Sequence, residues 1–161
     1  MKLWIYLIPL LLPACVHHPL KPPVGDGIYP FGTYQHYVRI QILNPPRTMD
    51  LRGVVSYQPE HLKVVGLSAF GTTLFRIDES LTTGELKKEF FLEIMQQHPE
   101  QFVTFYNLIR EIITAPKGTM EFTKQNAHFL LSDPDELGIP RKIHVEHPQF
   151  ILDVEVTSYD F

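Results

Sequence analysis

The sequence contains one cysteine, Cys15, and no apolar run that is long enough to cross a bilayer as a helix. A single cysteine cannot form an intramolecular disulfide, so a disulfide-stapled fold is excluded. The apolar run from Leu3 to Leu12 has about half of the roughly 20 residues that a membrane-spanning helix requires. We therefore expect no intramolecular disulfide in the chain, and we do not expect this run to span a membrane.

Basic residues are in the minority. The chain has 14 Lys and Arg against 18 Asp and Glu, which gives a formal net charge of −4 at pH 7. An excess of negative charge repels nucleic-acid phosphates and anionic lipid headgroups. Nucleic acid is therefore not expected as a partner, and any attachment to a membrane is expected to run through a covalent lipid.

The motifs that mark common active sites are also missing. There is no G-x-S-x-G, no G-x-x-x-x-G-K-[ST] and no H-E-x-x-H. His144 and His147 are three residues apart on an expected strand, so their side chains should point to opposite faces. His17 and His18 are adjacent residues in an expected flexible linker, where such a pair rarely forms a specific metal site. We therefore expect no enzyme activity, no cofactor and no metal site.

The N-terminus has the arrangement typical of a secretory signal peptide: Lys2 is followed by an apolar run and by small residues before Cys15. The segment Leu12-Pro13-Ala14-Cys15 resembles the lipobox of bacterial lipoproteins, in which the cysteine is lipidated and becomes the mature N-terminus. Pro13 departs from that pattern, because a small or β-branched residue is usual there. The alternative is an ordinary secretory signal with a leftover cysteine.

A lipidated Cys15 would anchor the protein, since each buried methylene contributes about 0.8 kcal/mol. By similarity to enterobacterial lipoproteins, Val16 in place of Asp implies the outer membrane, with the protein facing the periplasm. The stretch from Val16 to Phe31 has four prolines, two glycines and no hydrophobic period, which is typical of an extended tether. We expect a signal peptide over 1–14, the lipidated cysteine and tether over 15–32, and a folded domain over 33–161.

Alternation of apolar and polar residues predicts an antiparallel meander in the first part of the domain. Four stretches show it and are separated by turn residues; they span 33–44, 49–58, 61–67 and 72–80. In the first stretch Tyr34, His36, Val38 and Ile40 share one side, which we expect to be buried. The other side should face solvent.

The period changes after Gly84. Residues 85–98 and 99–114 predict two helices, with apolar residues of the second repeating at three and four. Further on, we expect a strand over 127–131, a polar turn over 132–138 and a closing two-strand hairpin around His147 and Pro148.

A twisted antiparallel sheet covered by apolar helices can enclose a cavity for one ligand. The alternative is that the large side chains fill the interior completely, and the alternation is compatible with both. The candidates for lining a ligand-binding cavity are Tyr37, Val38, Ile40, Leu51, Val55, Val64, Leu74, Phe102, Tyr106 and Ile109.

Two segments resemble the LolB family of bacterial outer-membrane lipoproteins, within the LolA/LolB superfamily. One contains "LRGVVSY" and "LKVVGLSAFGTTLFRID", and the other is "GIPRKIHVEHPQFILDVEVTSYDF". The resemblance implies an α+β fold, an antiparallel unclosed β-barrel (half barrel) capped by two helices, with a hydrophobic cavity for acyl chains. The chain departs from that family in being shorter, with helices expected where the family places further strands and loops.

In the LolB family a loop of the form Pro-Leu-Gly projects an exposed leucine that promotes transfer into the bilayer. Here Ala69-Phe70-Gly71 is the similar stretch, which implies that Phe70 is a membrane-facing residue. The alternative is that this turn folds back and Phe70 tucks into the barrel mouth.

The resemblance implies a membrane-anchored lipoprotein that binds acyl chains or lipidated proteins and aids lipoprotein or lipid transfer to the outer membrane. A second hypothesis is a non-enzymatic scaffold lipoprotein with a filled core. Its sheet edge or the Phe70 loop would then dock another cell-envelope protein.

Overall fold

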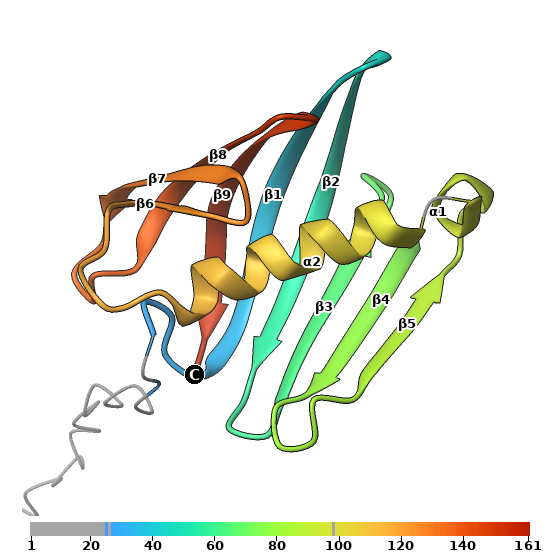
Figure 1. Ribbon diagram of the computed structural model, residues 1–161. Helices are drawn as coiled ribbons and strands as arrows, with labels where there is room; N and C mark the ends of the chain where they lie inside the picture. The colour runs from blue at the N-terminus through green and yellow to red at the C-terminus, as the bar shows by residue number, and fades with distance from the viewer. Residues whose placement is uncertain (1–24, 26, 98) are drawn as a thin grey trace, which may run out of the picture.

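A single antiparallel sheet, strongly twisted and wrapped around one long helix, makes up most of the protein (Figure 1). This computed structural model describes residues 25, 27–97 and 99–161. The helices are α1 (Glu93–Gln97) and α2 (Pro99–Thr114). The strands are β1 (Gly32–Leu43), β2 (Pro46–Tyr57), β3 (His61–Leu67), β4 (Thr73–Ser80), β5 (Leu86–Phe90), β6 (Glu121–Lys124), β7 (Ala127–Pro134), β8 (Pro140–His147) and β9 (Phe150–Asp160).

The sheet has nine described strands in the order β5-β4-β3-β2-β1-β9-β8-β7-β6. Two meanders, β1 to β5 and β6 to β9, are joined where β1 pairs with β9. The two edges, β5 and β6, do not pair with each other, so the sheet is unclosed. The expected α+β fold with an open antiparallel sheet is thereby confirmed.

Strand alternation places the core on the concave face of the sheet. In β9, for example, Phe150, Leu152, Val154 and Val156 are buried, while the residues between them are more exposed. Helix α2 lies across this face (Figure 1) and buries Phe102, Tyr106, Leu108, Ile112 and Ile113. The predicted helix over 99–114 and the closing hairpin are both confirmed. Each fully buried side chain of this kind stabilises the fold by about 1.5–3 kcal/mol.

The first expected helix, over 85–98, is wrong for most of its length. Leu86–Phe90 is the edge strand β5, and the described helical residues are those of α1. Leu86 and Phe90 are the two partly buried side chains of β5. Their spacing of four fits one helical turn as well as one face of a strand, so the period does not discriminate. The open edge of β4 then decides in favour of a strand, with Phe75 paired to Phe90.

The domain also begins earlier than the expected boundary at residue 33. Residues 27–31 pack against the end of α2 instead of forming a tether, and Ile28 and Tyr29 are buried. The Ile28 backbone N–H donates to the Ala115 carbonyl at 2.7 Å. Gly27 is required there, because a Cβ would lie 2.2 Å from the Ile113 carbonyl oxygen.

Strand β6 was not expected, and β7 continues to Pro134, beyond the expected turn at residue 132. The hairpin between β6 and β7 turns at Gln125 and Asn126, both with positive φ (52° and 60°). This left-handed pair is typical of a tight two-residue hairpin. With four residues and one partly buried side chain, β6 carries too little alternation to be recognised in the sequence.

Candidate ligand-binding site

An apolar cavity of about 60 Å³ lies between α2 and the concave face of the sheet. Its walls come from α2 and from strands on both sides of the β1–β9 junction. Of the predicted lining residues, the cavity brings together Val38, Ile40, Leu51, Val55, Val64, Phe102 and Ile109. The interior is therefore not completely filled, although this volume is far below the roughly 300–1,000 Å³ of typical ligand pockets.

Three predicted lining residues lie elsewhere. Tyr37 is on the convex face, where its hydroxyl accepts a hydrogen bond from Arg39 at 3.3 Å. Tyr37 and Val38 are neighbours on one strand, so they cannot share a face. Leu74 likewise points away from the cavity because its neighbour Phe75 lines it. Tyr106 is buried, but its hydroxyl bonds to a carboxylate instead of facing the cavity.

The cavity is also lined by residues that were not predicted to line it: Tyr29, His36, Gly53, Phe75, Phe105, Ile112, Ile113, Ile143, Leu152 and Val154. Leu152 and Val154 lie on β9, in the predicted closing hairpin. The signal for Phe75 lies in Gly66, its partner on β3, because a Cβ at Gly66 would lie 2.1 Å from the Phe75 ring. A glycine opposite an aromatic residue makes room for an inward ring.

Two polar side chains line the otherwise apolar cavity. His36 is 8% exposed, and burial lowers the pKa of its imidazole to about 4, with a hydrogen bond to the Gly53 backbone acting in the opposite direction. It is therefore neutral at pH 7. The hydroxyl of Tyr29 is buried and has no hydrogen-bond partner among the described residues. Burial raises the pKa of Tyr29, so this hydroxyl stays protonated.

A second cavity, of about 300 Å³, lies where the N-terminal half of α2 meets the ends of β1 and β9. We call it the mouth; it is lined by Ile42, Asn44, Gln101, Thr104, Phe105, Pro148, Gln149 and Phe150. Phe105 lines both the mouth and the apolar cavity, so its side chain belongs to the wall between them. The ring centroids of Phe105 and Phe150 are 4.4 Å apart, so the two rings pack together in this wall.

Polar contacts fix the middle and the C-terminal half of helix α2 to the sheet. Tyr106 donates a hydrogen bond to Glu79 on β4, and Arg110 Nε lies 3.3 Å from the same carboxylate. Glu111 forms an ion pair with Lys124. Phe102 and Phe105, near the mouth, contact aromatic rings of the sheet instead. Separation of these ring contacts would leave no buried polar group unpaired.

Phe70 lies in solvent rather than in the barrel mouth, with 97% of its side chain exposed. The Ser68 hydroxyl accepts hydrogen bonds from the backbone N–H of Phe70 at 3.3 Å and of Thr72 at 3.1 Å. Gly71 provides the left-handed residue of this turn, with φ of 81°. The turn therefore has a defined shape that presents Phe70 outward.

Other exposed apolar side chains lie at the same end of the sheet as Phe70. The β1–β2 turn, the β3–β4 turn and the segment after β5 all lie there (Figure 1). We call this set the apolar rim; it consists of Leu43, Phe70, Phe91 and Leu92. The mouth opens at this end too, because Ile42 and Phe150 pair at the end of the β1–β9 ladder.

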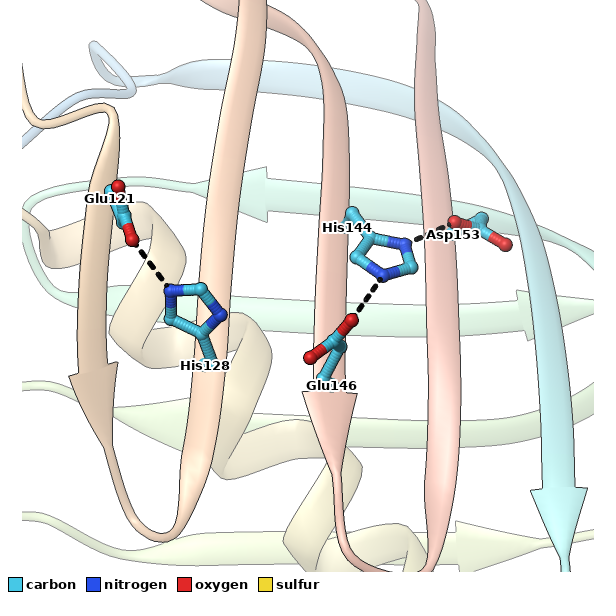
Figure 2. Close-up of polar contacts among 5 residues, drawn as sticks. All are labelled: Glu121, His128, His144, Glu146 and Asp153. Carbon is cyan, nitrogen blue, oxygen red and sulfur yellow. Dashed lines mark hydrogen bonds and ion pairs between the residues drawn. The ribbon is translucent and has the colours of Figure 1, made fainter.

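Histidines and carboxylates gather on the convex face, away from the cavity (Figure 2). His144 Nδ1 lies 2.6 Å from Asp153, and His144 Nε2 lies 3.4 Å from Glu146. The hydrogen bond with Asp153 raises the pKa of His144. His147 instead stacks on Phe150, with ring centroids 4.4 Å apart, so His144 and His147 lie on opposite faces as predicted. Within the described residues, no group of three or more His, Cys, Asp or Glu could hold a metal ion.

Cys15, His17 and His18 lie outside the described residues. In the part of the chain that the structure covers, no helix is long and apolar enough to cross a membrane. Comparison with models of protein families gave no match, and neither did comparison with curated protein sequences.

Proposed function

We propose that the protein is a membrane-anchored, LolB-like lipoprotein that binds acyl chains or lipidated proteins beneath α2 and aids their transfer to the outer membrane. The observation that carries this proposal is the apolar cavity between α2 and the open sheet. Its lining is apolar except for two uncharged side chains, Tyr29 and His36. The lipid on Cys15 would hold the protein at the membrane.

Binding requires the cavity to grow, because about 60 Å³ is too small for an acyl chain. In the proposed mechanism the part of α2 before Tyr106 moves away from the sheet while Tyr106 and Glu111 keep the rest of the helix in place. Separation of the Phe105 and Phe150 rings then joins the mouth to the cavity. Each methylene that leaves water offsets the lost packing by about 0.8 kcal/mol.

The position of the apolar rim supports transfer of the ligand towards a membrane. An exposed phenylalanine at the tip of a defined turn is suited to enter the headgroup region of a bilayer. With the mouth at the same end of the sheet, a chain leaving the cavity would emerge beside the membrane. The proposed transfer therefore needs no covalent chemistry.

Fluorescence titration of the purified protein with Nile red, followed by displacement with 1-palmitoylglycerol, tests the proposal. The matched variants are Val55→Phe, which adds a ring to the cavity lining, and Val54→Phe, which adds the same ring to the convex face. We expect saturable one-site binding that Val55→Phe weakens and Val54→Phe leaves unchanged.

The small volume of the cavity favours one other candidate, a scaffold lipoprotein whose exposed rim docks another cell-envelope protein. That candidate predicts no saturable binding of Nile red or 1-palmitoylglycerol by the folded wild-type protein. The same titration therefore decides between the two functions.

A further inference from the structure

Tyr29 has a hydroxyl for which the described fold provides no hydrogen-bond partner. The residue is 1% exposed and lines the apolar cavity. A buried hydroxyl without a partner destabilises the folded protein, because it gives up its bonds to water without replacement. Phenylalanine would fill the same space without this penalty, so the hydroxyl calls for a role outside the unliganded fold.

Neighbouring tyrosines have their hydroxyls satisfied. Tyr34, whose ring centroid lies 4.6 Å from that of Tyr29, donates to the Pro30 carbonyl at 2.6 Å. Tyr159 donates to the Asp135 carboxylate at 2.7 Å. The unpaired state of Tyr29 is therefore not a general property of this aromatic cluster.

The second polar residue of the cavity lies close to the first. The ring centroids of His36 and Tyr29 are 6.2 Å apart, and both residues line the cavity. His36 carries no charge at pH 7, because burial lowers its pKa to about 4. Together they form one polar end in an otherwise apolar site.

The described lining of the cavity supplies no cation at this polar end, because none of its residues is Lys or Arg. The nearby Arg141 is paired with Asp135, with Nη2 and Oδ2 3.5 Å apart, and the two act on Tyr29 in opposite directions. A buried carboxylate requires a cation or several donors, so a fatty acid anion is a poor fit. An ester carbonyl requires only one donor.

We propose that the Tyr29 hydroxyl, beside His36, forms a polar subsite that recognises the uncharged ester carbonyl of an acyl ligand by donating to the carbonyl oxygen. The site then prefers acyl esters to fatty acid anions. This inference rests on the proposed function, because it assumes that a ligand enters the cavity. The ester carbonyl of the ligand would accept the hydrogen bond for which the Tyr29 hydroxyl has no acceptor in the described, unliganded fold.

Three probes of similar length test the subsite: methyl decanoate with an ester, decanoate with a charge, and undecane with no polar group. Displacement of Nile red from the purified protein gives a Kd for each probe. Tyr29→Phe should raise the Kd of methyl decanoate about tenfold and leave that of undecane unchanged. Tyr37→Phe is the control, because Tyr37 lies on the convex face away from the cavity.

Equal affinity of wild type and Tyr29→Phe for methyl decanoate would overturn the subsite and leave the proposed function standing, since the ligand still binds. Tighter binding of decanoate than of its methyl ester at pH 8 would overturn the ester preference. Absence of binding by all three probes would overturn both proposals together. Circular dichroism of Tyr29→Phe ensures that a changed Kd does not come from a changed fold.

Discussion

Tyr106 on α2 donates a hydrogen bond to the carboxylate of Glu79 on β4, which is only 7% exposed. Arg110 stands 3.3 Å from the same carboxylate and supplies positive charge from the solvent side. A buried carboxylate is tolerated only with such partners. This contact fixes the middle of α2 to the sheet, and the proposed mechanism moves only the part of the helix before it.

Tyr106→Phe should therefore destabilise the protein by about 1–3 kcal/mol, because it leaves the Glu79 carboxylate buried with one donor fewer. Urea unfolding followed by far-UV circular dichroism measures the loss. Tyr37→Phe, which alters an exposed tyrosine on the convex face, should change the free energy of unfolding by less than about 0.5 kcal/mol. Equal stability of Tyr106→Phe and wild type would show that the contact does not hold α2.

Tyr29 and Tyr34 allow the opposite comparison. Tyr29→Phe removes a hydroxyl that has no partner in the described fold and should stabilise the unliganded protein by about 1 kcal/mol or more. Tyr34→Phe removes the donor to the Pro30 carbonyl and should destabilise it by a similar amount. Thermal unfolding of both variants checks the signs; a lower Tm for Tyr29→Phe would indicate that its hydroxyl is satisfied in the free protein.

Acid should weaken the fold through His36. Its pKa is about 4 in the folded protein against 6.5 for an unperturbed histidine, so the unfolded chain binds the proton first. The contribution is present above pH 6.5 and is lost as the pH falls towards 4, by roughly 3 kcal/mol in all. His36→Leu should remove this pH dependence of the free energy of unfolding. A wild-type stability that stays constant from pH 7 to pH 4 would contradict it.

His144 should act with the opposite sign. Asp153 raises the pKa of His144 in the folded protein, so the ion pair stabilises the fold below the unfolded pKa and this stability is lost as the pH rises through the folded pKa. His144→Gln should therefore increase the loss of stability on acidification relative to wild type. Unfolding curves at pH 5 and pH 8 measure the difference. Identical pH profiles for His144→Gln and wild type would rule out a contribution from this pair.

Phe70→Ala should leave the Tm and the Nile red affinity unchanged, because the side chain is 97% exposed and does not line the cavity. It should reduce association of the Cys15→Ser protein, which lacks the proposed lipid, with phosphatidylcholine vesicles in a flotation assay. Leu137→Ala is the control, since Leu137 is 50% exposed in the turn before β8, at the other end of the sheet. Equal flotation of the two variants would remove Phe70 from the membrane-facing role.

Most of the sheet follows from alternation, because a strand with one buried face must change character at every residue. That signal was sufficient for the first meander and the closing hairpin. The prediction was wrong at Leu74, although Phe75 and Ile77 alternate with polar residues and so indicate the inward face. The pairing of Phe75 with Gly66 indicates the same face.

The polar end of the cavity, formed by Tyr29 and His36, could not be predicted from the sequence for another reason. Tyr29 stands in a segment rich in proline and glycine, where no period distinguishes a core residue from a linker residue. Its burial depends on the contact of residues 27–31 with the end of α2, which is a tertiary effect. His36 was placed on the buried side of its strand, but its role depends on Tyr29 and was equally hidden.

The pairing of β1 with β9 also bears on how the molecule assembles. Among the described strands, β1 is the first in the chain, and it receives its second neighbour from β9, the last, with Thr33 paired to Asp160. Until β9 has been synthesised, β1 presents a bare strand edge, which is a template for mispairing with other chains. Such distant pairing makes folding slow. Chaperone protection should therefore matter most in the interval before the final strand arrives.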